Sequence, residues 1–316
     1  MIAVLRKAES LAALLGIVIL AIAISPVAAD GSRIFLQAGN LTDILRQISL
    51  IGIISVAMTF VILTGGIDLS VGSTLALSTT LAATALARQG HGIPAAIALA
   101  LAASAAVGAL NGVVIATLRI QPFIVTLATM IGVRGLAKWL SNNENIDIGF
   151  GHDLAARFAE VFRAKSVVIG SYLAISAAFL ALLARTVFGR HVRAIGDNEK
   201  AAEYAGLPIR AIKIWVYSLC GLLSGFAGVL YAAENHQGNP NAGVAYELDA
   251  IAAVVIGGTR LSGGKGSIAG TIVGTLFMGI LTNMLRLKNV DSNVEMMIKA
   301  VIIVLAVAGQ RGRKTR

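Results

Sequence analysis

The feature that most constrains this chain is the recurrence of apolar stretches, each about as long as a bilayer is thick, along nearly all of its 316 residues. Crossing a hydrocarbon core of roughly 30 Å takes about 20 helical residues. Only 13% of the residues are charged, against about 25% in a typical soluble domain. The sequence therefore predicts an all-α, polytopic membrane helical bundle that forms a single transmembrane domain over residues 1–316.

Ten helical segments are expected along the chain. The eighth is too short to span alone, so we expect it to be a half-helix or to run on into the loop that follows. Eight spans would also fit if two of the short segments dip into the membrane and return. The ten segments are expected at about 11–29, 48–64, 69–87, 94–117, 122–140, 166–185, 213–233, 249–258, 267–286 and 294–309.

The first apolar stretch allows two interpretations. Basic residues precede it and small residues follow it, a pattern that is also typical of a cleaved signal peptide. Residues 11–29 are nevertheless near full spanning length, and the chain that follows is polytopic. We expect an uncleaved first span.

Lysine and arginine between the apolar stretches predict sidedness. Residues 185–213 carry six of them against three acidic residues, whereas residues 234–248 carry none. By the positive-inside rule the first connection is cytoplasmic and the second lies outside. Arg6 and Lys7 precede the first span, and basic residues close the chain at 311–316. Both termini are therefore expected in the cytoplasm, so the span count is even. Because the positive-inside rule explains the net charge of +10, no nucleic-acid partner is expected.

The stretch Gly-Gly-Ile-Asp-Leu-Ser-Val-Gly at 65–72 places paired glycines and an acid between two apolar runs. An ionisable group at such a position is expensive unless it faces water, a partner or a polar cavity, so Asp68 is a functional candidate. It is equally a candidate helix cap, because its carboxylate can accept hydrogen bonds from the free amides of a helix that starts near Leu69. Gly65 and Gly66 would supply the turn.

A related stretch, Gly-Gly-Thr-Arg-Leu-Ser-Gly-Gly, occupies 257–264 and shares the pattern G-G-x-x-L-S-x-G. Two halves of a transporter often carry broken helices at matching places, but short Gly/Ser matches also arise by chance, so an internal repeat stays open. A phosphate-binding loop is excluded, since Thr259 stands where its first glycine and Gly266 where its hydroxyl residue would be. Three G-x-x-x-G patterns, at 108–112, 221–225 and 270–274, predict close helix packing.

Metal and redox chemistry find no support in the residue pattern. The only cysteine, Cys220, lies within an apolar run, and His91, His152, His191 and His236 are far apart with no ligand spacing. No metal, cofactor or catalytic residue is expected, and an intramembrane enzyme lacks a paired nucleophile and base.

Four blocks in the same order resemble the ribose-type family of bacterial ABC importer permeases, and together they cover about residues 50–310. They are TFVILTGGIDLSVGSTLAL, NGVVIATLRIQPFIVTLATMIGVRGLA, RAIGDNEKAAEYAGL and AIAAVVIGGTRLSGGKGSIAGTIVGTLF. The resemblance implies a bacterial inner-membrane permease that pairs with a second copy or a paralogue. It also implies a periplasmic sugar-binding protein, and a cytoplasmic ATP-binding subunit that carries out the ATP hydrolysis, so that the permease itself is not an enzyme.

The resemblance also assigns roles to residues. The connection 186–212 would be the cytoplasmic coupling loop, and Asp197 departs from the glycine that the family commonly has there. The coupling positions implied are Gly196, Asn198, Glu199, Ala202 and Gly206. The residues expected at the helix breaks or along the translocation path, where hydroxyl and amide groups suit a sugar, are Gly65, Gly66, Asp68, Ser70, Asn111, Gln121, Thr126, Thr129, Gly257, Gly258 and Ser262.

Two other readings remain open at the level of sequence. A secondary transporter would need intramembrane charges to couple protons or sodium ions, and Asp68 is the only acid that the sequence places convincingly near the membrane. The second is an ABC permease for a nucleoside, because the sequence does not identify the substrate.

Overall fold

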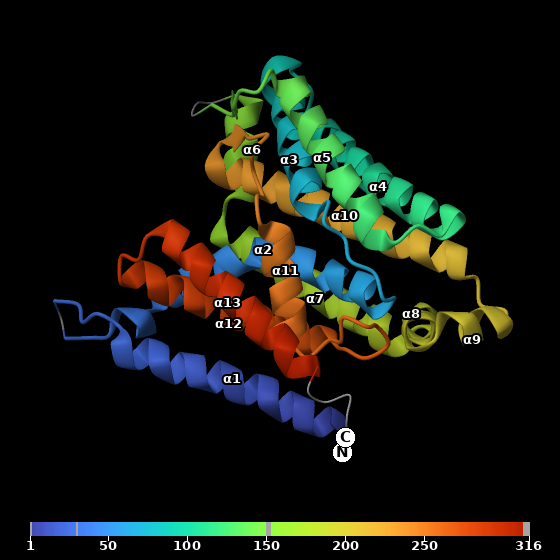
Figure 1. The fold of residues 1–316 in the computed structure, drawn as a ribbon. Coiled ribbons are helices and arrows are strands. Elements are labelled where there is room, and N and C mark those ends of the chain that lie inside the picture. The colour runs from blue at the N-terminus through green and yellow to red at the C-terminus, as the bar shows by residue number, and fades with distance from the viewer. Residues whose placement is uncertain (1, 30, 150–152, 312–316) are drawn as a thin grey trace.

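The computed structural model describes residues 2–29, 31–149 and 153–311 of the chain, which form thirteen α-helices and one two-stranded ribbon (Figure 1). The described elements are α1 (Ile2–Ile24), η1 (Ile34–Leu36), α2 (Ala38–Leu63), α3 (Val71–Ala83), η2 (Thr84–Arg88), α4 (Ile93–Leu118), α5 (Pro122–Ser141), β1 (Ile146–Asp147), α6 (Leu154–Phe162), α7 (Lys165–Arg185), α8 (Val187–Asp197), α9 (Glu199–Tyr204), α10 (Ile209–Asn235), β2 (Gln237–Gly238), α11 (Tyr246–Ile256), α12 (Ile268–Leu287) and α13 (Ser292–Arg311). His152 and the basic residues 312–316 lie outside the described part.

All ten predicted segments coincide with helices, which confirms the all-α bundle. They correspond to α1, α2, α3 with η2, α4, α5, α7, α10, α11, α12 and α13. Six of the described helices, α2, α4, α5, α7, α10 and α12, are long and apolar enough to cross a membrane. The eighth segment is the 11-residue helix α11, which is a half-helix as expected.

Three details differ from the sequence-based expectation. Helix α3 starts at Val71 instead of near Leu69, because residues 66–69 are not helical. The connections also contain α6 and α8, which were not predicted because their polar faces keep them out of any apolar stretch. Each has its own N-cap: Asp153 accepts a hydrogen bond from the Ala156 amide at 2.8 Å, and Thr186 accepts one from the Gly189 amide at 3.2 Å.

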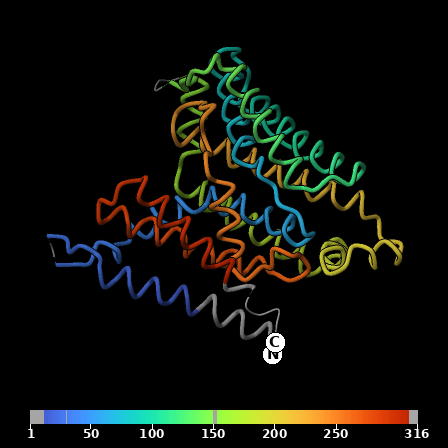
Figure 2. Tube along the Cα trace, in the orientation of Figure 1, coloured from blue at the N-terminus to red at the C-terminus, as the bar shows by residue number. Residues whose placement is uncertain are grey.

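Two groups of helices pack against one another (Figures 1 and 2). In one group α10 packs along α4 and against α3, and α5 lies beside α3. In the other, α2 contacts α7, α11 and α12, and α1 lies against α12. The groups meet where α10 contacts α2, and residues 64–70 carry the chain from α2 in one group to α3 in the other.

Glycines at the helix crossings let the backbones approach closely, as the G-x-x-x-G patterns predict. A side chain on Gly108 of α4 would overlap the carbonyl oxygen of Tyr217 on α10, and one on Gly221 of α10 would overlap that of Ser104 on α4. The α11–α12 crossing is built in the same way, because Gly274 packs against the carbonyl of Ala253. These crossings fix the helices that hold the polar groups described below.

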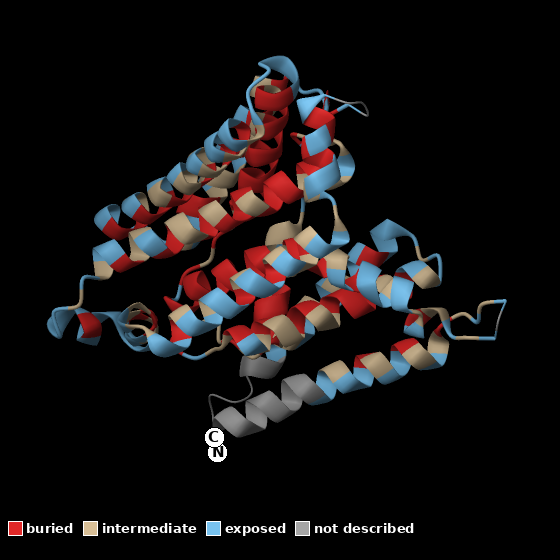
Figure 3. Cartoon of the chain, turned by 180° about the vertical axis from the view of Figure 1, so that it is seen from behind, coloured by how far each residue is buried: buried red, intermediate tan, exposed pale blue. Residues whose placement is uncertain are grey.

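The outer surface of the bundle is apolar where lipid would cover it. Buried residues gather between the helices, and exposed ones cover the outer faces (Figure 3). Exposed side chains on α4 and α5 include Leu110, Leu118 and Ile131, which suit acyl chains. Trp139 near the end of α5 is 75% exposed, as an interfacial residue should be.

Candidate functional site

The break between α2 and α3 is made by glycine, as predicted. Gly65 has a φ of +80°, and the amides of Gly65 and Gly66 donate to the carbonyls of Ile62 and Val61, which ends α2 in a Schellman-type cap. Residues 66–69 then run without helical structure inside the protein. Non-helical backbone at membrane depth is tolerated only where protein or a polar cavity surrounds it.

A chain of polar side chains surrounds this break. Asp68, only 1% exposed, accepts hydrogen bonds at its Oδ1 from the Ser70 amide (2.9 Å) and the Ser70 hydroxyl (2.6 Å). Asn111 of α4 donates to Ser70 Oγ at 3.0 Å, and Thr129 of α5 donates to Asn111 Oδ1 at 2.6 Å. Four of the residues predicted for the translocation path therefore form one network across three helices.

The other two polar candidates on α5 differ in position. Thr126 is fully buried and donates to the carbonyl of Ile67 at 3.1 Å, so it also contacts the break. Gln121 is exposed at the start of α5 and lies apart from the network. Arg134 donates to the backbone carbonyls of Pro240 and Ala242 and ties α5 to the loop before α11.

The second glycine-rich stretch also ends a helix. The amides of Gly258 and Thr259 donate to the carbonyls of Val255 and Val254, and Gly258 has a φ of +88°. This is the same kind of cap as at Gly65, but it is displaced by one residue relative to the shared pattern. The stretch then makes a further turn through Gly263 and Gly264, both at positive φ, before α12 begins.

The two stretches meet in space. The Gly264 amide donates to the carbonyl of Leu63, the last residue of α2, at 3.0 Å. Gly196 of α8 packs onto this contact so tightly that a side chain there would overlap both the Leu63 carbonyl oxygen and the Gly264 amide nitrogen. Gly65 and Ser262 face each other across the same place. We refer to residues 63–65, 196 and 262–264 as the glycine junction.

The coupling-loop candidates divide into inward and outward positions. Gly196 and Ala202 face the chain itself, and Ala202 is 5% exposed. Asn198 caps α9 by accepting from the Ala201 amide at 3.0 Å, and Glu199 pairs with Lys213 at 2.6 Å. Asn198 and Glu199 lie at the start of the short helix α9, and Ala202 lies within it.

The outward side of α9 carries a residue that sequence reasoning missed. Tyr204 is 89% exposed, and Gly206, at a φ of +77°, has no atom near the place where a side chain would point. Asp197, the departure from the family pattern, places its carboxylate against Gly264 of the glycine junction. An aromatic residue at the end of a short polar helix was the available signal for Tyr204.

Asp68 is not the only buried acid, which corrects the sequence-based expectation. Lys299 of α13 pairs with Asp249 of α11 at 3.2 Å and with Glu295 at 3.0 Å. Glu295 also accepts a hydrogen bond from the hydroxyl of Thr282 on α12 at 3.1 Å. The four-residue spacing of Glu295 and Lys299 was the signal for this cluster. Within the described residues, no group of three or more His, Cys, Asp or Glu side chains is placed to hold a metal ion.

Comparison with known proteins places these features in a family. Residues 40–307 match the family described as the permease component of branched-chain amino acid transport systems. The ribose import permease protein of Escherichia coli K12 is 43% identical over 308 residues, covering 96% of this chain and 93% of that protein. The ribose import permease protein of Bacillus subtilis is 41% identical over 300 residues, covering 95% and 92%. The L-arabinose ABC transporter permease protein of Azospirillum brasilense is 40% identical over 286 residues, covering 89% and 83%. No solved structure matches the chain.

Proposed function

Because the chain belongs to the monosaccharide ABC importer permease family, we propose that it is the membrane-spanning subunit of an ATP-driven importer for a monosaccharide or a related polyol. Its relatives at 40–43% identity are permeases for ribose and L-arabinose, which favours a sugar over the amino acids in the family's description. In this proposal the chain is a multi-pass inner-membrane permease, and a separate subunit hydrolyses the ATP.

The glycine junction is the single observation that carries a mechanism. Helix α8 contacts the end of α2 and the stretch after α11 through Gly196, with no side chain in between. A displacement of α8 and α9 would therefore move the ends of α2 and α11 together, because closely packed backbones are hardly compressible and transmit the movement. We infer that the motion of the ATP-binding subunit reaches the translocation path at this junction.

The outward side of α9 supports a docking surface for the ATP-binding subunit. Tyr204 and Gly206 are exposed next to each other at the end of α9, and neither contributes to the packing of the chain. Large aromatic side chains are enriched where proteins bind one another. Gly196 and Ala202 would then position the coupling loop from within, while Tyr204 and Gly206 contact the partner.

The polar network around Asp68 is proposed to line or close the path at the helix break. Asp68, Ser70, Asn111 and Thr129 satisfy one another by hydrogen bonds, so the network is stable in a buried setting. Thr126 supports the break from α5, whereas Gln121, exposed at the start of α5, would act only at the entrance or exit.

The orientation and the remaining partners follow from the same proposal. Both termini and α8–α9 are placed in the cytoplasm because Lys and Arg accumulate there. The opposite end, with α6 and the β1–β2 ribbon, then receives the periplasmic sugar-binding protein, and a second copy or a paralogue completes the permease.

Reconstituted transport tests the proposed function. Liposomes would contain the permease, its ATP-binding subunit and ATP, with the binding protein outside. Labelled D-ribose, L-arabinose, D-xylose and D-fructose would be compared with adenosine and leucine. We expect uptake of at least one sugar, dependent on ATP and on the binding protein. Uptake of adenosine or leucine alone, or uptake driven by a proton or sodium gradient without ATP, would contradict the proposal.

A further inference from the structure

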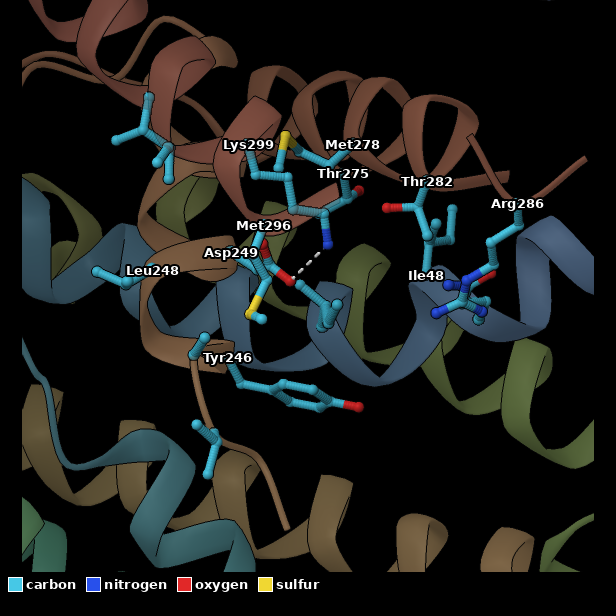
Figure 4. A pocket seen from close by; sticks show the side chains of 17 residues that line it. Ile48, Tyr246, Leu248, Asp249, Thr275, Met278, Thr282, Arg286, Met296 and Lys299 are labelled. Carbon is cyan, nitrogen blue, oxygen red and sulfur yellow. Dashed lines mark hydrogen bonds and ion pairs between the residues drawn. The ribbon is translucent and has the colours of Figure 1, made fainter. Parts of the chain in front are cut away.

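A cavity of about 310 Å³ lies among α2, α11, α12 and α13, away from the Asp68 network. Its volume falls within the range of small-molecule pockets, roughly 300–1,000 Å³. Apolar side chains such as Ile48 and Met278 form much of the wall, and a few polar groups converge on the space (Figure 4). The polar residues are Gln47, Tyr246, Asp249, Thr275, Thr282, Arg286 and Lys299.

The charged side chains of the cavity wall, Asp249, Arg286 and Lys299, are balanced by Glu295, which is not itself part of the wall. Lys299 lies between Asp249 and Glu295, and Arg286 approaches Glu295 at 3.8 Å. Two cations therefore face two carboxylates, and the side chains of Lys299, Asp249 and Glu295 are only 16%, 13% and 8% exposed. A balanced cluster offers many hydrogen-bond donors and acceptors without a net field, which suits a neutral polyhydroxylated ligand better than an ion.

Tyr246 adds an aromatic surface to these polar groups. It is the first residue of α11, and its ring lies on one side of the cavity with Lys299 and Asp249 above it in the view of Figure 4. The preceding Ala245 adopts a φ of +69°, a strained conformation for alanine. Such strain persists where the surroundings demand a particular geometry, and it is often found at ligand sites.

Helix α11 connects this cavity to the glycine junction. It runs only from Tyr246 to Ile256 and ends at Gly257 and Gly258, directly before the stretch that Gly196 contacts. Substrate sites in secondary transporters are typically formed by such short, discontinuous helices. A displacement at the junction would therefore move the wall of the cavity as a rigid half-helix.

We propose that this cavity is a binding site for the sugar during its passage, with Tyr246 packing against the ring and Asp249, Lys299 and Thr282 bonding the hydroxyl groups. This inference rests on the proposed function, because the cavity is the place where the importer would bind its sugar. The balanced ion cluster keeps the empty site stable, and its hydrogen-bonding capacity is shared with the ligand when one enters.

Protection of an introduced cysteine tests the site directly, because the native Cys220 is fully buried. Leu248→Cys places a thiol on the cavity wall, and Leu36→Cys on η1, outside the cavity, is a matched control with nearly the same exposure, 52% against 49%. The reconstituted importer would be labelled with a charged methanethiosulfonate reagent, with and without D-ribose, L-arabinose, D-xylose or D-fructose in the millimolar range. Leucine serves as the ligand control.

We expect a transported sugar to slow the labelling of Leu248→Cys and to leave that of Leu36→Cys unchanged. Adding Tyr246→Leu, which removes the ring without unpairing a charge, should raise the half-protecting sugar concentration about tenfold. An importer that takes up a sugar which never protects Leu248→Cys would overturn the pocket but not the proposed function. Protection without transport would support the pocket and contradict the proposed function. Absence of both would overturn both.

Discussion

The amide of Gly264 donates a 3.0 Å hydrogen bond to the carbonyl of Leu63, and this contact joins two glycine-rich stretches that lie about two hundred residues apart in the chain. Each stretch ends a helix of the bundle, and Gly196 of α8 packs onto the contact between them. The connection formed by α8 and α9 therefore exposes Tyr204 on its outer side and contacts both helix breaks on its inner side. This arrangement gives the coupling loop a direct route to the interior.

The network around the first break predicts the cost of losing Asn111. Asn111→Leu removes the bonds to Ser70 and Thr129 and leaves the buried Ser70 hydroxyl and the half-buried Thr129 hydroxyl without that partner. We expect the free energy of unfolding to fall by about 1–3 kcal/mol, measured by thermal or denaturant unfolding in detergent. Thr117→Val on the same helix is the control, since the Thr117 hydroxyl bonds only the carbonyl one turn before it and the residue is exposed. An equal loss in both variants would contradict the network.

Substitutions of Asp68 separate its charge from its hydrogen bonds. Asp68→Asn keeps an oxygen that can accept both bonds from Ser70, so we expect stability close to that of the wild type and near-normal uptake. Asp68→Ala leaves the Ser70 amide and hydroxyl unpaired and should cost about 1–3 kcal/mol. A well-folded Asp68→Asn variant that no longer transports would show that the carboxylate charge takes part in transport, as a secondary transporter would require.

The exposed end of α9 predicts different effects for two substitutions at one glycine. Gly206 needs a positive φ, which asparagine adopts readily. Gly206→Asn should therefore keep most uptake, whereas Gly206→Trp should abolish uptake and release the ATP-binding subunit. Co-purification of that subunit gives the answer, and unfolding of the permease alone controls for backbone strain. Normal partner retention and uptake in Gly206→Trp would remove α9 from the docking surface.

Topology is tested by reporter fusions at three places. Fusions within 196–206 and after Lys314 should report the cytoplasm, and one within 239–243 should report the periplasm, because of the distribution of Lys and Arg. Lys314 lies outside the described residues, so its side rests on the sequence alone. A periplasmic signal at either of the first two places would overturn the proposed orientation.

The sequence predicted the helices well because apolar stretches of spanning length leave few alternatives in a bilayer. It also identified Asp68, Asn111 and Thr129 as separate candidates. The sequence could not predict that these residues form one network, because the network depends on how α4 and α5 pack against the break. The orientation of Gly196 was missed for the same reason: only the fold shows that the Leu63 carbonyl occupies the space of its side chain.

The buried cluster of Asp249, Glu295 and Lys299 was missed for a different reason. Each residue stands near the end of an apolar stretch, where a charge usually reaches the interface. Helices α11 and α13 must come together before these charges pair inside the protein. The cavity beside them is likewise a product of packing.

Gly196→Ala in the reconstituted importer tests most directly whether the glycine junction carries the ATP-driven motion. The added methyl group would overlap the Leu63 carbonyl and push α8 from the junction, at a cost of about 1–3 kcal/mol. Gly170→Ala on α7 is the control, because a methyl group there meets no other atom. We predict that Gly196→Ala still retains the ATP-binding subunit and hydrolyses ATP but loses sugar uptake, while Gly170→Ala transports normally. Wild-type uptake by Gly196→Ala would contradict the account.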